Sequence, residues 1–106
     1  MEIDNFFLSN RDMTAVMILN NSLAETALLR LDHLAAYDRD KLPIICWDDA
    51  GMNKLLGLTT VQQFPEEIGR EAAKRVIGLI EKRDLPGEKK NIIGTELIIR
   101  SSCKPL

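Results

Sequence analysis

Two adjacent carboxylates, Asp48 and Asp49, follow an apolar run at residues 42–47. Such a run is typical of a parallel strand buried on both faces, and open α/β sheets bind ligands at the carboxyl ends of these strands. Successive strand residues point to opposite faces, so the acids can act as a pair only if the chain turns between them. We therefore expect Asp48 to face a ligand crevice and Asp49 to cap the following turn. The alternative is that both acids only cap a helix near residue 51.

A second candidate, Asn20, ends another apolar run at residues 14–19. A side-chain amide can both donate and accept hydrogen bonds, which suits recognition of a polyol. The sequence leaves an alternative equally open, in which Asn20 or Asn21 caps the helix that follows.

The segment between the two runs is predicted to be a helix over residues 22–36. Ser22 and Glu25 have the spacing of a capping box, and apolar residues then recur at helical spacing. Strand, helix and strand form a βαβ unit, which is right-handed in nearly all known cases. This connection is expected to bring Asn20 and Asp48 to the same edge of the sheet.

The flanking segments also alternate between helix and strand patterns. Residues 2–9 and 50–56 are predicted to be helical, with Gly57 ending the second of these helices. Residues 59–63 have strand propensity. We therefore predict an α/β fold with a mainly parallel sheet.

A second long helix is predicted to begin near Pro65, because proline suits a first helical turn and the acids after it suit the helix dipole. A turn over residues 84–87 should end it, and residues 91–101 can supply a last strand. Its apolar stripe consists of Ile68, Ala72, Val76, Leu79 and Ile80.

Three or four strands with two long helices are too few to cover both faces of strands this apolar. An isolated chain would leave sheet edge and apolar surface uncovered. We therefore expect either part of a larger protein or a homodimer or higher homo-oligomer.

Composition excludes several classes of function. The chain of 106 residues carries a net charge of -2, which gives no long-range attraction to nucleic-acid phosphates. Cys46 and Cys103 lack the spacing of a zinc or redox motif, so we expect reduced thiols in a cytoplasmic protein. His33 has no nucleophile at a suggestive spacing. Without a phosphate loop, nucleophile elbow or metal-ligand cluster, we expect no enzyme activity, cofactor or metal.

Together these segments resemble the closing part of the effector-binding domain of the lactose-repressor (LacI/GalR) family of bacterial transcription regulators. The family has an aromatic residue before its acid pair, where this chain has Trp47. The family signature Thr-Thr-x-x-Gln is present at residues 59–63, and Glu-Leu-Ile-Ile-Arg-Ser-Ser closes the match at residues 96–102. The resemblance covers roughly residues 10 to 104.

The resemblance implies roles for three side chains. Asp48 would accept hydrogen bonds from sugar hydroxyls or the polar edge of a base, while Asn20 and Gln63 would line the same cleft. This chain has Asn20-Asn21 where the family commonly has Asn-Asp, and Phe64-Pro65 where it has Pro-Phe.

The implied fold is part of a periplasmic-binding-protein-like, Rossmann-like three-layer domain. Residues 1–106 would be the C-terminal portion of that domain, in which the chain crosses between two lobes near Gln63 and returns near residue 90. A sugar or other small effector between the lobes would shift their angle and alter DNA affinity in a dimer, with DNA contacted only through an absent N-terminal domain.

Two other functions stay open. An assembly-only fragment would keep the dimer surface without binding an effector. A periplasmic sugar-binding protein of a transporter shares the fold but requires an export signal, and the N-terminal residues resemble neither a signal peptide nor a membrane span.

Overall fold

A computed structural model describes residues 2–34, 38–83 and 90–103. The chain forms two compact units. The first unit comprises Met1–Gln62 with Leu97–Leu106, and the second comprises Gln63–Glu96. Each unit is described by itself below.

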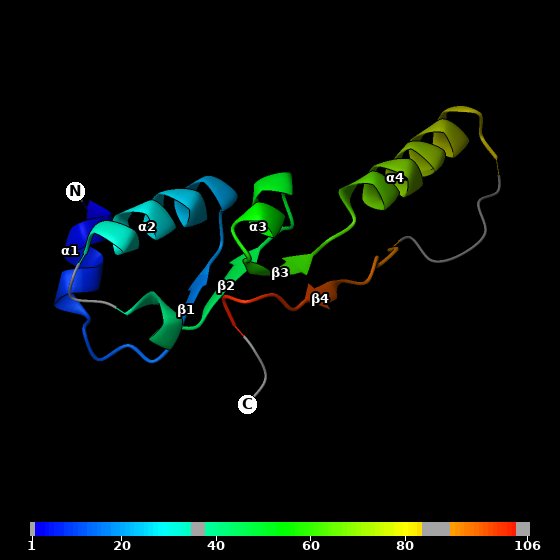
Figure 1. The fold of residues 1–106 in the computed structure, drawn as a ribbon. Coiled ribbons are helices and arrows are strands. Elements are labelled where there is room, and N and C mark those ends of the chain that lie inside the picture. Colours follow the sequence, from blue (N-terminus) through cyan, green and yellow to red (C-terminus); the bar gives the residue numbers. More distant parts are fainter. Residues whose placement is uncertain (1, 35–37, 84–89, 104–106) are drawn as a thin grey trace. The chain divides into compact units, whose positions relative to one another are not determined.

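The predicted α/β class is confirmed. Strands β1 (Val16–Ile18), β2 (Ile44–Trp47) and β3 (Thr59–Gln62) pair in parallel, and with β4 (Glu96–Ile98) the sheet order is β1-β2-β3-β4. Helices and strands alternate along the chain, as Figure 1 shows. The elements up to the unit boundary are α1 (Glu2–Ser9), β1 (Val16–Ile18), α2 (Asn21–His33), the 3₁₀ turn η1 (Arg39–Lys41), β2 (Ile44–Trp47), α3 (Gly51–Leu55) and β3 (Thr59–Gln62).

The predicted βαβ unit is formed by β1, α2 and β2. Ile18 lies opposite Cys46 in the parallel register. Helix α2 begins at Asn21, so the proposed capping box of Ser22 and Glu25 is wrong. The strand β1 is shorter than the apolar run that predicted it, because it covers only Val16–Ile18.

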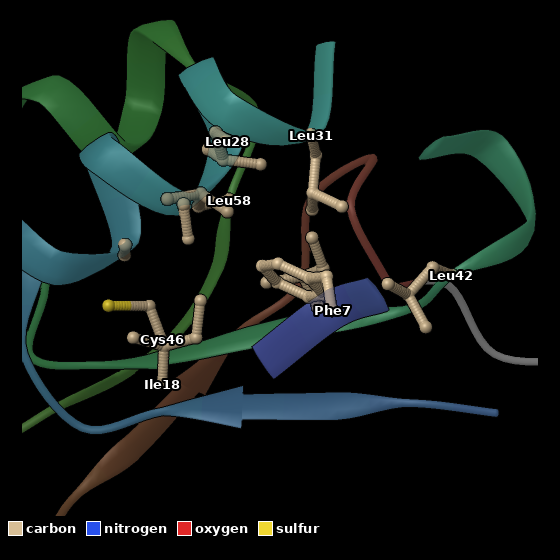
Figure 2. Packing of buried hydrophobic residues seen from close by; sticks show 10 residues of the cluster. Phe7, Ile18, Leu28, Leu31, Leu42, Cys46 and Leu58 are labelled. Atoms are coloured by element: carbon tan, nitrogen blue, oxygen red, sulfur yellow. The ribbon is translucent and has the colours of Figure 1, made fainter. Parts of the chain in front are cut away.

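A hydrophobic core fills the space between the sheet and helices α1 and α2. Phe7 from α1 and Leu28 and Leu31 from α2 lie against the strand residues Ile18 and Cys46 (Figure 2). Burial of each large apolar side chain contributes about 1.5 to 3 kcal/mol. This contribution holds both helices on one face of the sheet.

The other face of β2 is less covered than the sequence suggested. Ile44 and Cys46 are buried, whereas Ile45 and Trp47 are half-buried, and this alternation follows the pleat of the strand. Trp47 is therefore not a core residue.

The closing segment at residues 100–103 returns to the amino ends of β2 and β3. The Ser102 carbonyl oxygen accepts from the Ile44 N–H at 2.9 Å, and its hydroxyl donates to the Ile44 carbonyl oxygen at 2.6 Å. The same hydroxyl accepts from the Thr59 N–H at 2.8 Å, while the Ser102 N–H donates to the Gly57 carbonyl oxygen at 2.9 Å. Ser102 thus joins the two strands where they begin.

The second unit contains α4 (Pro65–Ile80), which starts at Pro65 with Glu66 and Glu67 in its first turn, as predicted. Much of its apolar stripe lies on the surface, with Leu79 and Ile80 exposed by 72% and 74%. Among the described residues, no helix is long and apolar enough to cross a membrane.

The end of the chain is less regular than expected. Strand β4 covers only Glu96–Ile98 of the strand predicted within residues 91–101. The turn predicted over residues 84–87 lies outside the described residues.

Gly57 ends α3, and its φ of +67° lies in the left-handed region that favours glycine. A Cβ at this position would also overlap with the Ser101 hydroxyl. We expect Gly57→Ala to lower the free energy of unfolding by at least about 1 to 2 kcal/mol, measured by urea titration. Gly51→Ala is the matched control, because a Cβ there meets no atom within 4 Å. Equal stability of the two variants would contradict the prediction.

Candidate functional site

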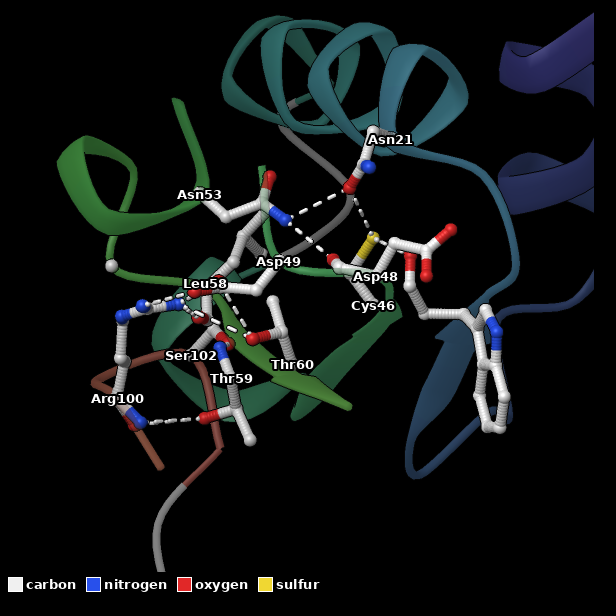
Figure 3. Close-up of polar contacts among 12 residues, drawn as sticks. Asn21, Cys46, Asp48, Asp49, Asn53, Leu58, Thr59, Thr60, Arg100 and Ser102 are labelled. Carbon is white, nitrogen blue, oxygen red and sulfur yellow. Dashed lines mark hydrogen bonds and ion pairs between the residues drawn. The ribbon is translucent and has the colours of Figure 1, made fainter. Parts of the chain in front are cut away.

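Asn20 and Asp48 lie at the same edge of the sheet, as the βαβ connection predicted. Each residue comes two positions after one of the paired residues Ile18 and Cys46, at the carboxyl ends of β1 and β2. In parallel sheets this edge is the usual place for ligands. The polar residues around it are drawn in Figure 3.

Asn20 caps helix α2. Its side-chain oxygen accepts from the Leu23 N–H at 3.0 Å, and its carbonyl oxygen accepts from the Ala24 N–H at 2.9 Å. The capping alternative is therefore correct for Asn20. A ligand at this exposed side chain would be bound by the amide nitrogen, since the side-chain oxygen serves the cap.

Asn21 makes contacts that the sequence did not predict. Its side-chain oxygen accepts from the Asn53 amide nitrogen at 2.8 Å and lies 3.4 Å from the Cys46 sulfur. Asn53 also donates to the main-chain oxygen of Asp48 at 2.9 Å. Fully buried Asn53 thus joins α3 to the start of α2 and to the end of β2.

Asp48 sits at a sharp turn in the backbone. Its φ is 70°, in the left-handed region that Asp and Asn adopt more readily than most residues. The main chain is held on both sides, because the Asp48 N–H donates to the Val61 carbonyl oxygen at 3.0 Å and its own carbonyl oxygen accepts from Asn53. Its half-buried carboxylate points away from Asn21 and Asn53 (Figure 3).

Asp49 does not cap the following helix, so that expectation is wrong. The residue at the cap of α3 is Ala50, which makes no side-chain cap hydrogen bond. Asp49 instead accepts two hydrogen bonds from Arg100, with Oδ1–Nη1 and Oδ2–Nη2 distances of 2.7 and 3.1 Å. The Thr60 hydroxyl donates to Oδ1 at 2.8 Å. The alternative in which both acids cap α3 is wrong for the same reason.

The Asp49–Arg100 ion pair is largely shielded from water, because both side chains are only 16% exposed. Hydrogen bonds from Arg100 hold the pKa of Asp49 below its usual value of 3.8, although burial acts in the opposite direction. The same pair raises the pKa of Arg100. Asp49 is therefore anionic at neutral pH, and the pair occupies both of its oxygens.

The Cys46 thiol is a poor nucleophile in this setting. Burial raises its pKa, and the negative charges of Asp48 and Asp49 raise it further. Both Cys46 and Cys103 are free cysteines, as expected. Across the described ranges, no group of three or more His, Cys, Asp or Glu side chains could hold a metal ion.

Gln63 is the first residue of the second unit. The first unit therefore contains two of the three predicted ligand positions, Asn20 and Asp48. Gln63 is half-buried and precedes Phe64, whose φ of 56° is unusual for a bulky residue.

The sequence matches the family described as periplasmic binding protein-like domain over residues 5–103. This match spans almost the whole chain, so the protein belongs to the family of periplasmic binding protein-like domains. The mainly parallel sheet agrees with this family.

A solved structure from Staphylococcus saprophyticus subsp. saprophyticus, provisionally described as a transcription regulator, has the same fold. It is 29% identical in sequence and superposes with a TM-score of 0.72 over 92% of this chain. The chain spans only 35% of the length of that structure. A comparison with curated proteins found no match.

The Asp49–Arg100 pair predicts a specific acid sensitivity. Asp49→Asn should lower the free energy of unfolding at neutral pH by about 1.5 to 3 kcal/mol, because charge-assisted hydrogen bonds are lost. Since the folded pKa lies below 3.8, this stabilisation is present above pH 3.8 and disappears as pH falls through the folded pKa. Urea titrations between about pH 5 and pH 2 should show a larger loss for the wild type than for Asp49→Asn. Equal losses would contradict this assignment.

Proposed function

We propose that this chain is the effector-binding and dimerisation portion of a LacI/GalR-type bacterial transcription regulator. Membership of the periplasmic binding protein-like family and the likeness to a regulator structure support the proposal. The observation that carries it is that Asn20 and Asp48 both lie at the carboxyl ends of the paired strands β1 and β2. The family resemblance gives further support. It rests on the order of three motifs along the chain: the Asp48-Asp49 pair, the Thr-Thr-x-x-Gln series and the closing segment.

The effector we propose is a sugar or another small polar molecule. The Asp48 carboxylate would accept hydrogen bonds from two neighbouring hydroxyls, and the Asn20 amide nitrogen would donate to a third oxygen. The family resemblance makes Gln63 the third proposed ligand contact. Binding of this kind needs neither a catalytic group nor a cofactor, so we propose no enzyme activity.

The effect on DNA would be indirect. An effector that binds one arrangement of the two lobes better than another shifts the equilibrium between them. In a cytoplasmic homodimer this shift would alter the affinity of a separate DNA-binding domain. A periplasmic sugar receptor would use the same cleft without the DNA-binding domain.

An assembly-only role is a second candidate, and exposed apolar surface favours it. The stripe of α4 includes the largely exposed Leu79 and Ile80. In the first unit an apolar groove of about 460 Å³ lies beside the edge strand β1, between Phe6 on α1 and Met17 and Leu23. Surface of this kind commonly marks contacts with other chains.

Trp47 offers a direct test of effector binding, because it is the chain's single tryptophan and lies next to Asp48. We expect titration with a panel of monosaccharides and nucleobases to change its fluorescence saturably for one class. Asp48→Asn, which tolerates the left-handed backbone, should weaken that binding by about tenfold to more than a hundredfold.

Asp12→Asn is the control for loss of charge, since Asp12 is exposed and lies outside the proposed site. This variant should bind like the wild type. Unchanged affinity of Asp48→Asn with a lower melting temperature would assign Asp48 to structure. A panel that produces no saturable change would favour the assembly-only role.

Self-association has its own test. We expect sedimentation at micromolar concentration to show a homodimer or larger species, because exposed apolar stripes favour contact between copies. Leu79→Gln should weaken this association, while Arg70→Gln, on the opposite side of the helical wheel, should not. A stable monomer with a single cooperative unfolding transition would remove dimerisation from the proposal.

A further inference from the structure

The Asp49 carboxylate is contacted by both segments that connect the two units. Thr60, which donates to Oδ1 at 2.8 Å, lies two residues before Gln62, where the chain leaves the first unit. Arg100, which binds both oxygens, lies three residues after Leu97, where the chain returns. We call residues 60–62 and 97–100 the outgoing and returning segments. One side chain thus holds both segments.

Asp49 directly follows Asp48, the proposed ligand-binding residue, in the sequence. The Asp48 N–H donates to Val61 in the outgoing segment at 3.0 Å. The turn at Asp48 and Asp49 is therefore fixed to β3 by one main-chain and one side-chain hydrogen bond. If this turn moves, either Thr60 and Val61 move with it or the two hydrogen bonds break.

Arg100 is held by further hydrogen bonds to strand β3 and the residue before it. Its Nη1 also donates to the Leu58 carbonyl oxygen at 2.8 Å, and its main-chain N–H donates to the Thr59 hydroxyl at 2.8 Å. A guanidinium bound to a carboxylate through two parallel hydrogen bonds has a fixed geometry. Shielding from water also limits screening of the pair by salt.

We propose that Asp49 is a positioning residue that couples the turn at Asp48 to the outgoing and returning segments. A ligand that shifts Asp48 then displaces Thr60 and Arg100 together, and so acts on both connections to the second unit. This regulation rests on the proposed function, because it assigns effector contact to Asp48. Asp49 itself makes no ligand contact, since its oxygens already bind Arg100 and Thr60.

The coupling can be measured on the 106-residue chain without an effector. Asp48→Gly serves as the perturbation, because glycine frees the left-handed turn. The readout is hydrogen exchange, followed by NMR, of three amides: Asp48, Arg100 and Ser102, each of which donates a hydrogen bond. A double-mutant cycle combines Asp48→Gly with Asp49→Asn.

In the wild-type background, we expect Asp48→Gly to speed exchange at Arg100 and Ser102 by about fivefold or more. In the Asp49→Asn background, the same change should speed exchange at the Asp48 position only. A purely structural Asp49 would give additive effects, and additivity within experimental error overturns the proposal. If Asp49→Asn does not fold, Arg100→Lys, which keeps the charge but loses the paired geometry, completes the cycle.

Asp4→Asn is the matched control, because Asp4 also pairs with an arginine of the first unit, Arg30. That pair joins α1 to α2, so its loss should leave exchange at Arg100 and Ser102 unchanged. The experiment also separates the two proposals. If the double-mutant cycle shows coupling but no effector binds, the coupling stands and the proposed effector site is wrong. If an effector binds but the cycle is additive, only the proposed coupling is wrong.

Discussion

The first unit depends on contacts between residues 43 to 58 positions apart in the sequence, which join the closing segment at residues 100–103 to strands β2 and β3. Parallel strands cannot be joined by tight turns, so their amino ends present main-chain groups that need partners from elsewhere. Ser102 supplies these partners to Ile44 and Thr59, and Arg100 supplies a cation to Asp49 at the other end of β2. A buried group left without its partner costs about 1 to 3 kcal/mol. Loss of this segment would therefore weaken the sheet at both the amino and the carboxyl ends of its strands.

The amino and carboxyl ends of the strands differ in which of their polar groups the closing segment covers. At the amino end, hydrogen bonds of the closing segment cover the strands. At the carboxyl end, the main chain of the left-handed turn at Asp48 is held by hydrogen bonds with Asn53 and Val61, while the Asp48 carboxylate points away from Asn53 (Figure 3). Polar side chains on a loop held by a rigid scaffold are typical of binding sites. The main-chain contacts of Asp48 thus fix the backbone from which its side chain extends.

The sequence predicted the features that depend on neighbours along the chain. The βαβ connection, the end of α3 at Gly57 and the start of α4 at Pro65 follow from local patterns, and all three are present. It failed where the partner lies far away. Asp49 was expected to cap the next turn, but its partner Arg100 is 51 residues distant. The contact of Asn21 with Asn53 likewise has no local pattern, since an amide at a helix start equally suits capping.

Adjacent residues of identical type thus receive different electrostatic roles from their surroundings. Arg100 balances the charge of Asp49, so that carboxylate adds little repulsion toward an approaching ligand. In the proposed site a neutral polyol would suit one uncompensated carboxylate better than two, because a second anion would require a cation from the ligand. If an effector binds at this edge as proposed, the ion pair that fixes the strands would also favour a neutral ligand there. The return of Arg100 thus accounts both for the local geometry of the strands and for the balance of charge at Asp49.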